Sequence, residues 1–251
     1  MIEIDCLTKT FGDKTAVSDL TLRVEPGECF AFLGPNGAGK TTTIKTIAGL
    51  LRPTRGAVRV GGADTILEPL RAKARLAYVP DEPYLYEKLS GREFLLFTAD
   101  MYGLDRPEAR RRIAELVETF GLAGYVDDLC EGYSHGMKQR VVLSAALLRD
   151  PATLVVDEPM VGLDPRGARL VKDILRRRAE AGVCVFLSTH TLSVAEEVAT
   201  RIGIIHQSRL IALGTPQELR SRYGGERGLE SIFLELTRES EKTAPPPEEQ
   251  P

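Results

Sequence analysis

A chain of 251 residues is long enough to bury a substantial hydrophobic core, in one large domain or two small ones. Its 33 Lys and Arg residues against 36 Asp and Glu residues leave a net charge of −3, so there is no global basic field of the kind that predicts binding to nucleic acid. The four cysteines are scattered without a Cys-x-x-Cys pair, and no stretch reaches the about eighteen apolar residues of a membrane span.

The cysteine pattern argues against disulfides and against a zinc site, and it favours a reducing compartment. Residues 1–5 do not have the character of a signal peptide. We therefore expect a cytoplasmic location, with any attachment to a membrane made through a partner.

Residues 2–24 alternate apolar and polar side chains, and a Gly-Asp pair at residues 12 and 13 interrupts the pattern. This predicts strands joined by a turn, in an N-terminal antiparallel β subdomain. Phe11 stands at the turn. An aromatic side chain in this position either stacks on a nucleotide base or belongs to the core.

Residues 29–33 form an unbroken apolar run of strand length, and residues 44–51 have the apolar spacing of a helix. The glycine-rich loop between them can turn successive N–H groups inward around phosphate, and the following helix directs its positive dipole end there. Lys40 adds a positive charge, and the Thr41 hydroxyl is placed to ligate magnesium. A chance glycine-rich turn is the alternative, and the flanking strand and helix argue against it. The candidate nucleotide-binding residues are Gly34, Pro35, Asn36, Gly37, Ala38, Gly39, Lys40, Thr41 and Thr42.

Residues 57–62 and 75–80 carry strand patterns, after which the character of the chain changes. From about residue 88 to 150 the apolar residues have helical spacing, which predicts a helical subdomain inserted in an α/β domain. The basic run at residues 110–112 is either a solvated helix face or a nucleic-acid patch, and we expect the solvated face.

Strand and helix patterns alternate again from residue 153, with apolar strands at 153–156, 183–187 and 202–205. Such repetition predicts a parallel sheet covered on both faces, with catalytic groups beyond the carboxyl ends of its strands.

Three polar side chains end these strands: Asp157 and Glu158 follow one, and His190 closes another. Beside a phosphate loop, the first carboxylate is expected to hold magnesium, and the second to orient or deprotonate a water that attacks the γ-phosphate. His190 is either structural or a contact to the γ-phosphate, and its position favours the contact. An acidic strand end without function is the alternative for the carboxylates.

Two further segments, Tyr-Ser-His-Gly-Met-Lys-Gln-Arg at residues 133–140 and Gly-Leu-Asp-Pro at 162–165, stand in order with these motifs. With them, the chain resembles the nucleotide-binding subunit of an ATP-binding cassette transporter over about residues 3–214. The segment of Ser134 and Gly136 separates this family from other P-loop proteins. The resemblance implies a head-to-tail dimer in which this segment contacts the γ-phosphate held by the partner's Lys40 loop, with Asp164 at the interface. The motifs that carry the resemblance are Phe11 and residues 34–42, 133–140, 156–159, 162–165 and 188–190.

Two positions depart from the family pattern. Asp81 stands where the family has Gln, and with Thr41 and Asp157 it forms the expected magnesium-binding set, although a carboxylate cannot donate as an amide does. His135 replaces the first glycine of the signature, and it is either a tolerated surface variant or a pH-responsive phosphate contact.

The chain is also similar to stand-alone cassette subunits of bacterial exporters, which work with separately encoded membrane permeases. In this family the surface around residues 81–100 receives a cytoplasmic helix of the permease. We therefore expect Tyr84, Leu85 and Tyr86 to contribute to an apolar partner-binding groove. This similarity lies in residues 82–94, 133–137 and 229–237.

The resemblance implies an α/β fold: a P-loop NTPase core with a mainly parallel sheet, the antiparallel subdomain and the helical insertion. The ATPase domain is expected at residues 1–220, followed at 221–251 by a helix and a disordered Pro-rich acidic tail.

The expected function is ATP hydrolysis with Mg²⁺, coupled through cassette dimerisation to an integral membrane permease. We expect a homodimer on the cytoplasmic face of the membrane, and no nucleic acid. Two other functions stay open. One is a soluble cassette ATPase of translation or DNA repair, which usually carries a second cassette or a long extension. The other is a non-hydrolysing nucleotide-binding module, which conflicts with the presence of Asp157, Glu158 and His190.

Overall fold

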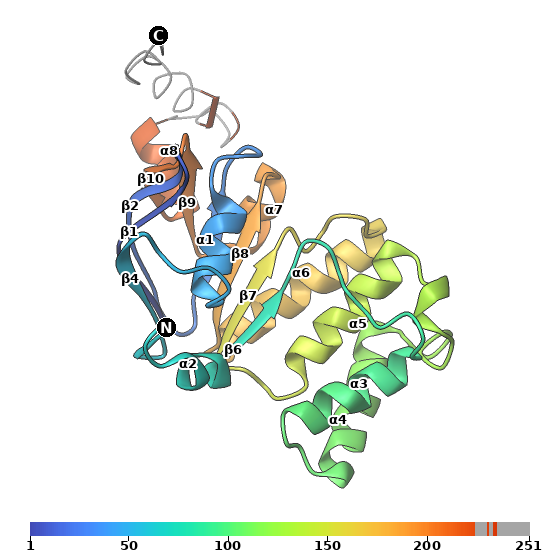
Figure 1. The fold of residues 1–251 in the computed structure, drawn as a ribbon. Coiled ribbons are helices and arrows are strands. Elements are labelled where there is room, and N and C mark those ends of the chain that lie inside the picture. Colours follow the sequence, from blue (N-terminus) through green and yellow to red (C-terminus); the bar gives the residue numbers. More distant parts are fainter. Residues whose placement is uncertain (224–229, 231–232, 235–251) are drawn as a thin grey trace.

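Two β-sheets organise the described part of the chain, which comprises residues 1–223, 230, 233 and 234 of the computed structural model (Figure 1). The smaller sheet has the strand order β2-β1-β4-β5, and its pairs are all antiparallel. The predicted N-terminal antiparallel subdomain is thereby confirmed. Its strands are β1 (Ile2–Phe11), β2 (Lys14–Val24), β4 (Arg55–Val60) and β5 (Ala63–Asp64).

The larger sheet has the order β10-β9-β3-β8-β7-β6 and is mainly parallel, as predicted. Only the edge strand β10 runs antiparallel to its neighbour among these described strands. The register pairs Asp157 with Ser188 and Leu33 with Thr189, so the carboxyl ends of β3, β7 and β8 meet at one edge. The strands are β3 (Cys29–Leu33), β6 (Leu76–Val79), β7 (Thr153–Asp157), β8 (Cys184–Thr189), β9 (Arg201–His206) and β10 (Arg209–Gly214).

Three helices, α3, α4 and α5, lie between residues 88 and 150 and form the predicted helical insertion (Figure 1). Their starts follow local sequence signals: Ser90 and Glu93 form a capping box, and Asp105 caps α4. The helices are α1 (Lys40–Ile47), α2 (Pro69–Arg75), α3 (Gly91–Met101), α4 (Arg106–Phe120), α5 (His135–Leu147), α6 (Pro165–Glu180), α7 (Leu192–Val198) and α8 (Pro216–Tyr223), with a 3₁₀ turn η1 (Cys130–Gly132).

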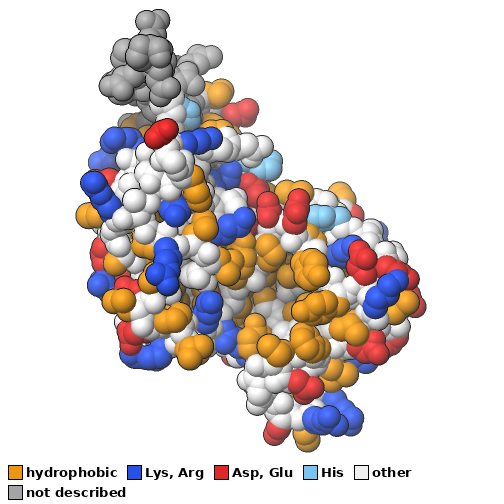
Figure 2. All heavy atoms as spheres, in the orientation of Figure 1, with side chains coloured by type: hydrophobic (Ala, Val, Ile, Leu, Met, Phe, Trp, Pro, Cys, Tyr) orange, Lys and Arg blue, Asp and Glu red, His pale blue; other side chains and the backbone are white. Residues whose placement is uncertain are grey.

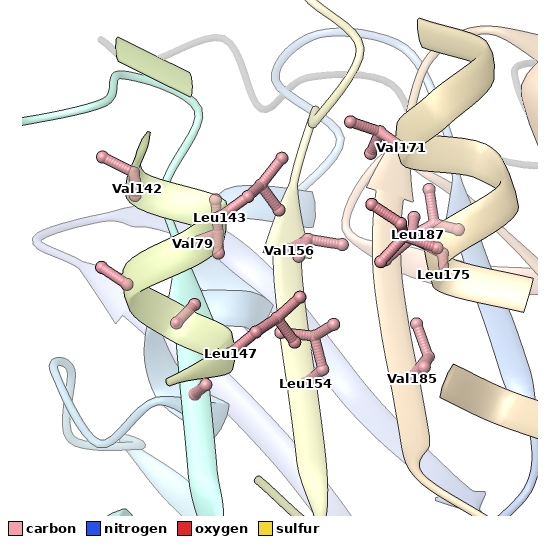
Figure 3. Packing of buried hydrophobic residues seen from close by; sticks show 14 of the residues in the cluster. Val79, Val142, Leu143, Leu147, Leu154, Val156, Val171, Leu175, Val185 and Leu187 are labelled. Atoms are coloured by element: carbon pink, nitrogen blue, oxygen red, sulfur yellow. The ribbon is translucent and has the colours of Figure 1, made fainter. Parts of the chain in front are cut away.

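The larger sheet separates two hydrophobic cores, because side chains alternate between its faces. Phe30 and Phe32 of β3 point into a core shared with α1 and the antiparallel sheet. Ala31 and Leu33 point into the other core, which is shared with the helices. Figure 3 shows this second core, where Leu147 of α5 and Leu175 of α6 lie against β7 and β8. Both faces are thus covered as predicted, one of them largely by the second sheet.

Some local expectations were wrong. The helix after the phosphate loop begins at Lys40, as expected, but it ends at Ile47, so the apolar spacing that continues to residue 51 extends beyond it. Strand β9 was predicted at residues 202–205, whereas its antiparallel neighbour β10 and the short elements α2 and β5 were not. The four cysteines are all free thiols.

The C-terminal predictions lie mostly outside the described residues. Leu229, Ile232 and Leu236 of the predicted tail helix fall there, as does the Pro-rich segment at 244–251. Phe233 is described, and it packs against the core that contains the helices. The domain boundary at residue 220 stays a prediction. Within the described ranges, no helix is long and apolar enough to cross a membrane.

Candidate functional site

The loop between β3 and α1 is glycine-rich because neighbouring backbone presses on it. A Cβ at Gly34 would overlap the carbonyl oxygen of Ile205, and a Cβ at Gly39 would overlap the carbonyl oxygen of Ala16. Gly39 also has a φ of +111°, which strongly favours glycine. The loop is therefore held tightly against β2 and β9, and its backbone can approach a ligand closely.

The N-terminus of α1 has free N–H groups and no nearby acidic side chain on its first turn, which favours binding of an anion. Its N-cap, Gly39, offers no side-chain acceptor, and the first turn contains no acidic residue. The first N–H groups of a helix have no partner within the helix and carry the positive end of its dipole. They therefore remain available to phosphate oxygens.

Lys40 lies over this loop and is buried, with 6% of the side chain exposed. Its Nζ donates hydrogen bonds to the carbonyl oxygens of Gly34, at 2.8 Å, and Pro35, at 3.2 Å. Nζ also lies 3.5 Å from Oε1 of Glu158. A buried positive charge is thus fixed between the phosphate loop and the end of β7.

A cavity of about 330 Å³ brings most of the predicted residues together. Phe11 stands at its mouth, 48% exposed, with Nζ of Lys9 4.8 Å from the ring centroid. The alternative that Phe11 belongs to the core is therefore wrong. Lys14 and Ala16 line the cavity too, and sequence reasoning missed them although the hairpin pairs Lys14 with Phe11. The lining residues are Phe11, Lys14, Ala16, Asn36, Gly37, Gly39, Lys40, Thr41, Thr42, Asp81 and Glu158.

Asp157, at the end of β7, is a fully buried carboxylate. Its pKa is raised because burial disfavours the charged form, although hydrogen bonds from the Ser188 and Thr41 hydroxyls act in the opposite direction. Its Oδ2 has no hydrogen-bond partner among the described residues. A buried carboxylate oxygen without a partner beside a hydroxyl fits a hard, oxygen-binding cation.

The expected metal-binding set is only partly assembled by this chain. Asp81 lines the same cavity as Thr41, but it is exposed, and its Oδ1 accepts a hydrogen bond from the N–H of Glu82 at 2.9 Å. In the described part of the chain, no group of three His, Cys, Asp or Glu side chains is arranged to hold a metal ion. Mg²⁺ prefers six oxygen ligands, so phosphate and water would have to supply the others.

Glu158 is held in a strained backbone conformation at the mouth of the cavity. Its φ is +46°, which costs a residue other than glycine about 1–2 kcal/mol. Its N–H faces the carbonyl oxygen of Ser188, at 3.3 Å, and the Ser188 Oγ, at 3.1 Å. These contacts hold the Glu158 backbone against the end of β8.

His190 contacts this carboxylate directly. Its Nδ1 lies 3.0 Å from Oε1 of Glu158, and the ring is 49% exposed. The sequence predicted that both residues would lie at the carboxyl ends of parallel strands, and they do. It missed the pair itself, which the register of Asp157 with Ser188 makes possible.

The segment of Ser134 and Gly136 lies apart from this cavity. Ser134 caps α5, where its hydroxyl accepts a hydrogen bond from the N–H of Met137 at 3.3 Å, and its side chain is exposed. Neither residue is among those lining the Lys40 cavity. The chain therefore presents this second helix N-terminus to solvent.

Tyr133 anchors that exposed N-terminus from below. Its hydroxyl donates to the carbonyl oxygen of Tyr125, at 2.7 Å, and accepts from the N–H of Gly91, at 3.1 Å. Burial raises the pKa of Tyr133 to about 12, so the hydroxyl stays protonated. The start of α3, the loop before η1 and the start of α5 are thereby joined.

A second cavity, of about 480 Å³, lies on the segment between β6 and α3. Tyr84 and Tyr86 are 73% and 46% exposed, and their ring centroids are 5.8 Å apart. Leu85 borders the cavity but is buried in the core, so the exposed face comes from the two tyrosines. Lys138 of α5 also lines it. Figure 2 shows hydrophobic side chains gathered where this segment crosses between the sheet and the helical insertion.

Comparison with known proteins identifies the relatives of this arrangement. Residues 17–161 match the family model described as ABC transporter. The linearmycin resistance ATP-binding protein LnrL of Bacillus subtilis (strain 168) is 40% identical over 226 residues, which cover 90% of this chain and 73% of that protein. The Nod factor export ATP-binding protein I of Paraburkholderia xenovorans (strain LB400) is 38% identical over 218 residues, covering 87% and 72%.

A solved structure, described as the ATP binding subunit of an ABC transporter, superimposes with a TM-score of 0.89. It is 34% identical in sequence and covers 94% of this chain and 99% of its own. The antiparallel sheet, the mainly parallel sheet and the helical insertion therefore form the fold of a P-loop ATPase cassette.

Proposed function

The chain belongs to the ABC transporter family and is an ATP-binding ATPase, and from this premise we propose that it powers an exporter through a separate membrane permease. Its relatives that confer linearmycin resistance or export Nod factor support the outward direction. The observation that carries the proposal is the position of Ser134 and Gly136: a firmly anchored helix N-terminus outside the chain's own nucleotide cavity. Such a half-site needs a second cassette.

In the proposed site, the β- and γ-phosphates of ATP bind the loop of residues 34–42 and replace the carbonyls of Gly34 and Pro35 as partners of Lys40. Phe11 stacks on the base. Thr41, Asp157 and Asp81 would hold Mg²⁺, which neutralises charge on the phosphates when bound. This assignment is supported by the unpartnered Oδ2 of Asp157 beside Thr41.

Glu158 is the proposed group that orients or deprotonates the attacking water. His190, whose Nδ1 lies 3.0 Å from Oε1 of Glu158, is the proposed partner of this carboxylate and the proposed contact to the γ-phosphate. Lys40 stabilises the charge that develops on the phosphate.

Two identical chains then close head to tail over two ATPs, so that Ser134 and Gly136 of each contact the γ-phosphate bound by the other. Ser134 supplies a hydroxyl, Gly136 permits close backbone approach, and the start of α5 supplies N–H groups and dipole. The test is Glu158→Gln, which we expect to keep ATP binding, to lose hydrolysis by about 100-fold or more, and to accumulate a dimer in size-exclusion chromatography with ATP and magnesium. Turnover near that of the parent protein would refute the role of Glu158.

We propose that the permease binds at the cavity lined by Tyr84 and Tyr86. This contact would hold the chain on the cytoplasmic face of the membrane. Two exposed, mutually packed aromatic rings are a typical anchor for a partner helix. Lys138 borders this cavity and lies one turn along α5 from Ser134. A movement of the permease would therefore reach the signature end of the same helix.

The partner is tested by purifying tagged Glu158→Gln protein with ATP from detergent-solubilised native membranes and identifying what accompanies it by mass spectrometry. We expect a polytopic membrane protein, and Tyr84→Ser with Tyr86→Ser should remove it. The matched control is Leu67→Ser with Leu70→Ser, since these side chains are 81% and 85% exposed on another surface. Ribosomal or DNA-repair partners from the soluble fraction would instead favour the alternative, a soluble cassette ATPase.

A further inference from the structure

The chain between Glu158 and α6 is a tight turn that starts at the proposed catalytic carboxylate. The carbonyl oxygen of Glu158 accepts a hydrogen bond from the N–H of Val161 at 3.1 Å, and Gly162 follows with a φ of +72°. The turn ends at Asp164, whose side chain caps α6 by accepting from the N–H of Gly167 at 3.0 Å. A change in the position of Gly162 would therefore also move Glu158 before it and Asp164 after it.

The first turns of α5 pack against this segment at three points. A Cβ at Gly136 would lie 3.0 Å from the carbonyl oxygen of Gly162. Arg140 donates a hydrogen bond from Nη2 to Oδ1 of Asp164 at 2.7 Å. The third contact is His135, because a Cβ at Gly162 would overlap Cδ2 of the imidazole and lie 3.0 Å from its Cγ.

The ion pair and the His135 contact differ in how strongly they can hold the turn against α5. The Arg140–Asp164 pair is partly exposed, with 24% and 55% of the side chains accessible, and such pairs contribute little by themselves. The His135 ring occupies the space beside the α-carbon of Gly162 where a Cβ would lie. The flat ring therefore restricts movement of the turn on that side. A glycine at position 135 could not make this contact.

We propose that His135 is a positioning residue: its ring, packed on Gly162, holds the turn from Glu158 to Asp164 against the N-terminus of α5. The signature residues Ser134 and Gly136 and the carboxylates of Glu158 and Asp164 are then presented to a second cassette as one rigid unit. This inference rests on the proposed function, because it assigns the unit a role in the closed dimer. Neither imidazole nitrogen is required, only the shape of the ring.

The test compares His135→Phe, which keeps a planar ring without nitrogens, with His135→Gly. We expect His135→Gly to lower kcat for ATP hydrolysis about tenfold with KM for ATP within about twofold, because a misplaced catalytic group affects the transition state. His135→Phe should stay within about threefold of the parent kcat. Loss of activity in both variants would point to an imidazole contact with phosphate, and parent activity in both would make His135 a tolerated surface residue; either result overturns the proposal.

A double-mutant cycle with Gly162→Ala checks the contact itself. In the parent background the new methyl group displaces the His135 ring, so kcat should fall about tenfold or more. In the His135→Gly background the same substitution meets no ring, and its further effect should be at most about threefold. Gly121→Ala is the matched control for backbone strain, since its φ is +64° and no atom lies within 4 Å of the added Cβ. Effects of Gly162→Ala that are equal in both backgrounds would refute the contact.

The failure of this inference can be told apart from failure of the proposed function. The Glu158→Gln protein is tested for ATP-dependent dimerisation with and without His135→Gly. If Glu158→Gln alone stays monomeric, the proposed dimer is wrong. If it dimerises and the added His135→Gly leaves the dimer and the ATP concentration needed for it unchanged, only the positioning role is overturned.

Discussion

The Lys40 cavity and the N-terminus of α5 are the two proposed phosphate-binding half-sites, and they are built in different ways. The cavity concentrates charge: Lys40 and Asp157 are buried, and the strained Glu158 lies between Lys40 and His190. The start of α5 has no acidic residue in its first turn, follows the exposed Ser134, and is fixed by the hydrogen bonds of Tyr133. Buried charges need partners close by, whereas a helix dipole can face solvent without them. In the proposed dimer, the first half-site is therefore complete within one chain, and the second would act only on the nucleotide of a partner.

The largest expected effect tests the charged half. Lys40→Ala removes the buried cation that faces the phosphate loop and leaves Glu158 with one partner fewer. We expect ATP binding to fall below detection at millimolar nucleotide and hydrolysis to fall about 1,000-fold or more. Fluorescent-nucleotide titration and phosphate release measure the two effects. Lys45→Ala is the matched control, because Lys45 is exposed on the same helix; a similar loss there would contradict the assignment to Lys40.

The second prediction tests whether the two half-sites meet in trans. Ser134→Ala should keep ATP binding to the monomer and lower hydrolysis about 100-fold, because its half-site acts on the partner's nucleotide. Mixing it in equal amounts with Lys40→Ala makes half of the dimers mixed. Each mixed head-to-tail dimer has one intact site of two, so the mixture should recover about a quarter of the parent activity if the sites turn over independently. A mixture no more active than the two variants alone would argue against this arrangement.

The third prediction concerns Tyr133, which anchors the start of α5. Tyr133→Phe removes the acceptor of the Gly91 N–H and the donor to Tyr125, so we expect the free energy of unfolding to fall by about 1–3 kcal/mol in urea titrations. Tyr125→Phe is the matched control. The Tyr125 hydroxyl is buried and has no hydrogen-bond partner in the part of the chain that the structure describes, so its removal should change stability little. If Tyr133→Phe lost no more stability than Tyr125→Phe, the hydrogen bonds of the Tyr133 hydroxyl would not be what holds α5.

The charged half-site was largely predictable from the sequence, because its residues follow one another along the chain or end parallel strands. Residues 34–42 are one continuous segment, a loop followed by the first turn of α1, and the apolar strands before Asp157 and His190 indicated that the side chains after them would share an edge. Local spacing and a single topological rule were sufficient. The same reasoning predicted the helical insertion, since apolar periodicity is a local property.

The contacts that depend on packing between distant segments were not predictable. Nothing in the sequence indicates that Nδ1 of His190 approaches Glu158, or that the His135 ring covers Gly162. Leu85 is apolar like its neighbours Tyr84 and Tyr86, yet it points into the core while they do not. Such differences arise from side-chain direction and tertiary contacts, which a one-dimensional pattern does not encode.

The smallest expected effect concerns the stability that the protein loses by burying the charge of Asp157. Because the pKa of Asp157 is raised in the folded protein, protonation favours the fold: this contribution to stability is full below about pH 4, the pKa of an unfolded Asp, and is lost as pH rises through the raised value. Asp157→Asn removes the buried charge, and an amide is less costly to bury than a carboxylate. We therefore expect a higher Tm than the parent protein at pH 7 and a weaker decline in Tm between pH 4 and 7, measured by calorimetry. Asp13→Asn, on an exposed turn, is the matched control and should leave Tm unchanged. A lower Tm for Asp157→Asn at pH 7 would mean that the carboxylate's hydrogen bonds from Ser188 and Thr41 outweigh its desolvation. The buried charge of Asp157 would then stabilise the fold.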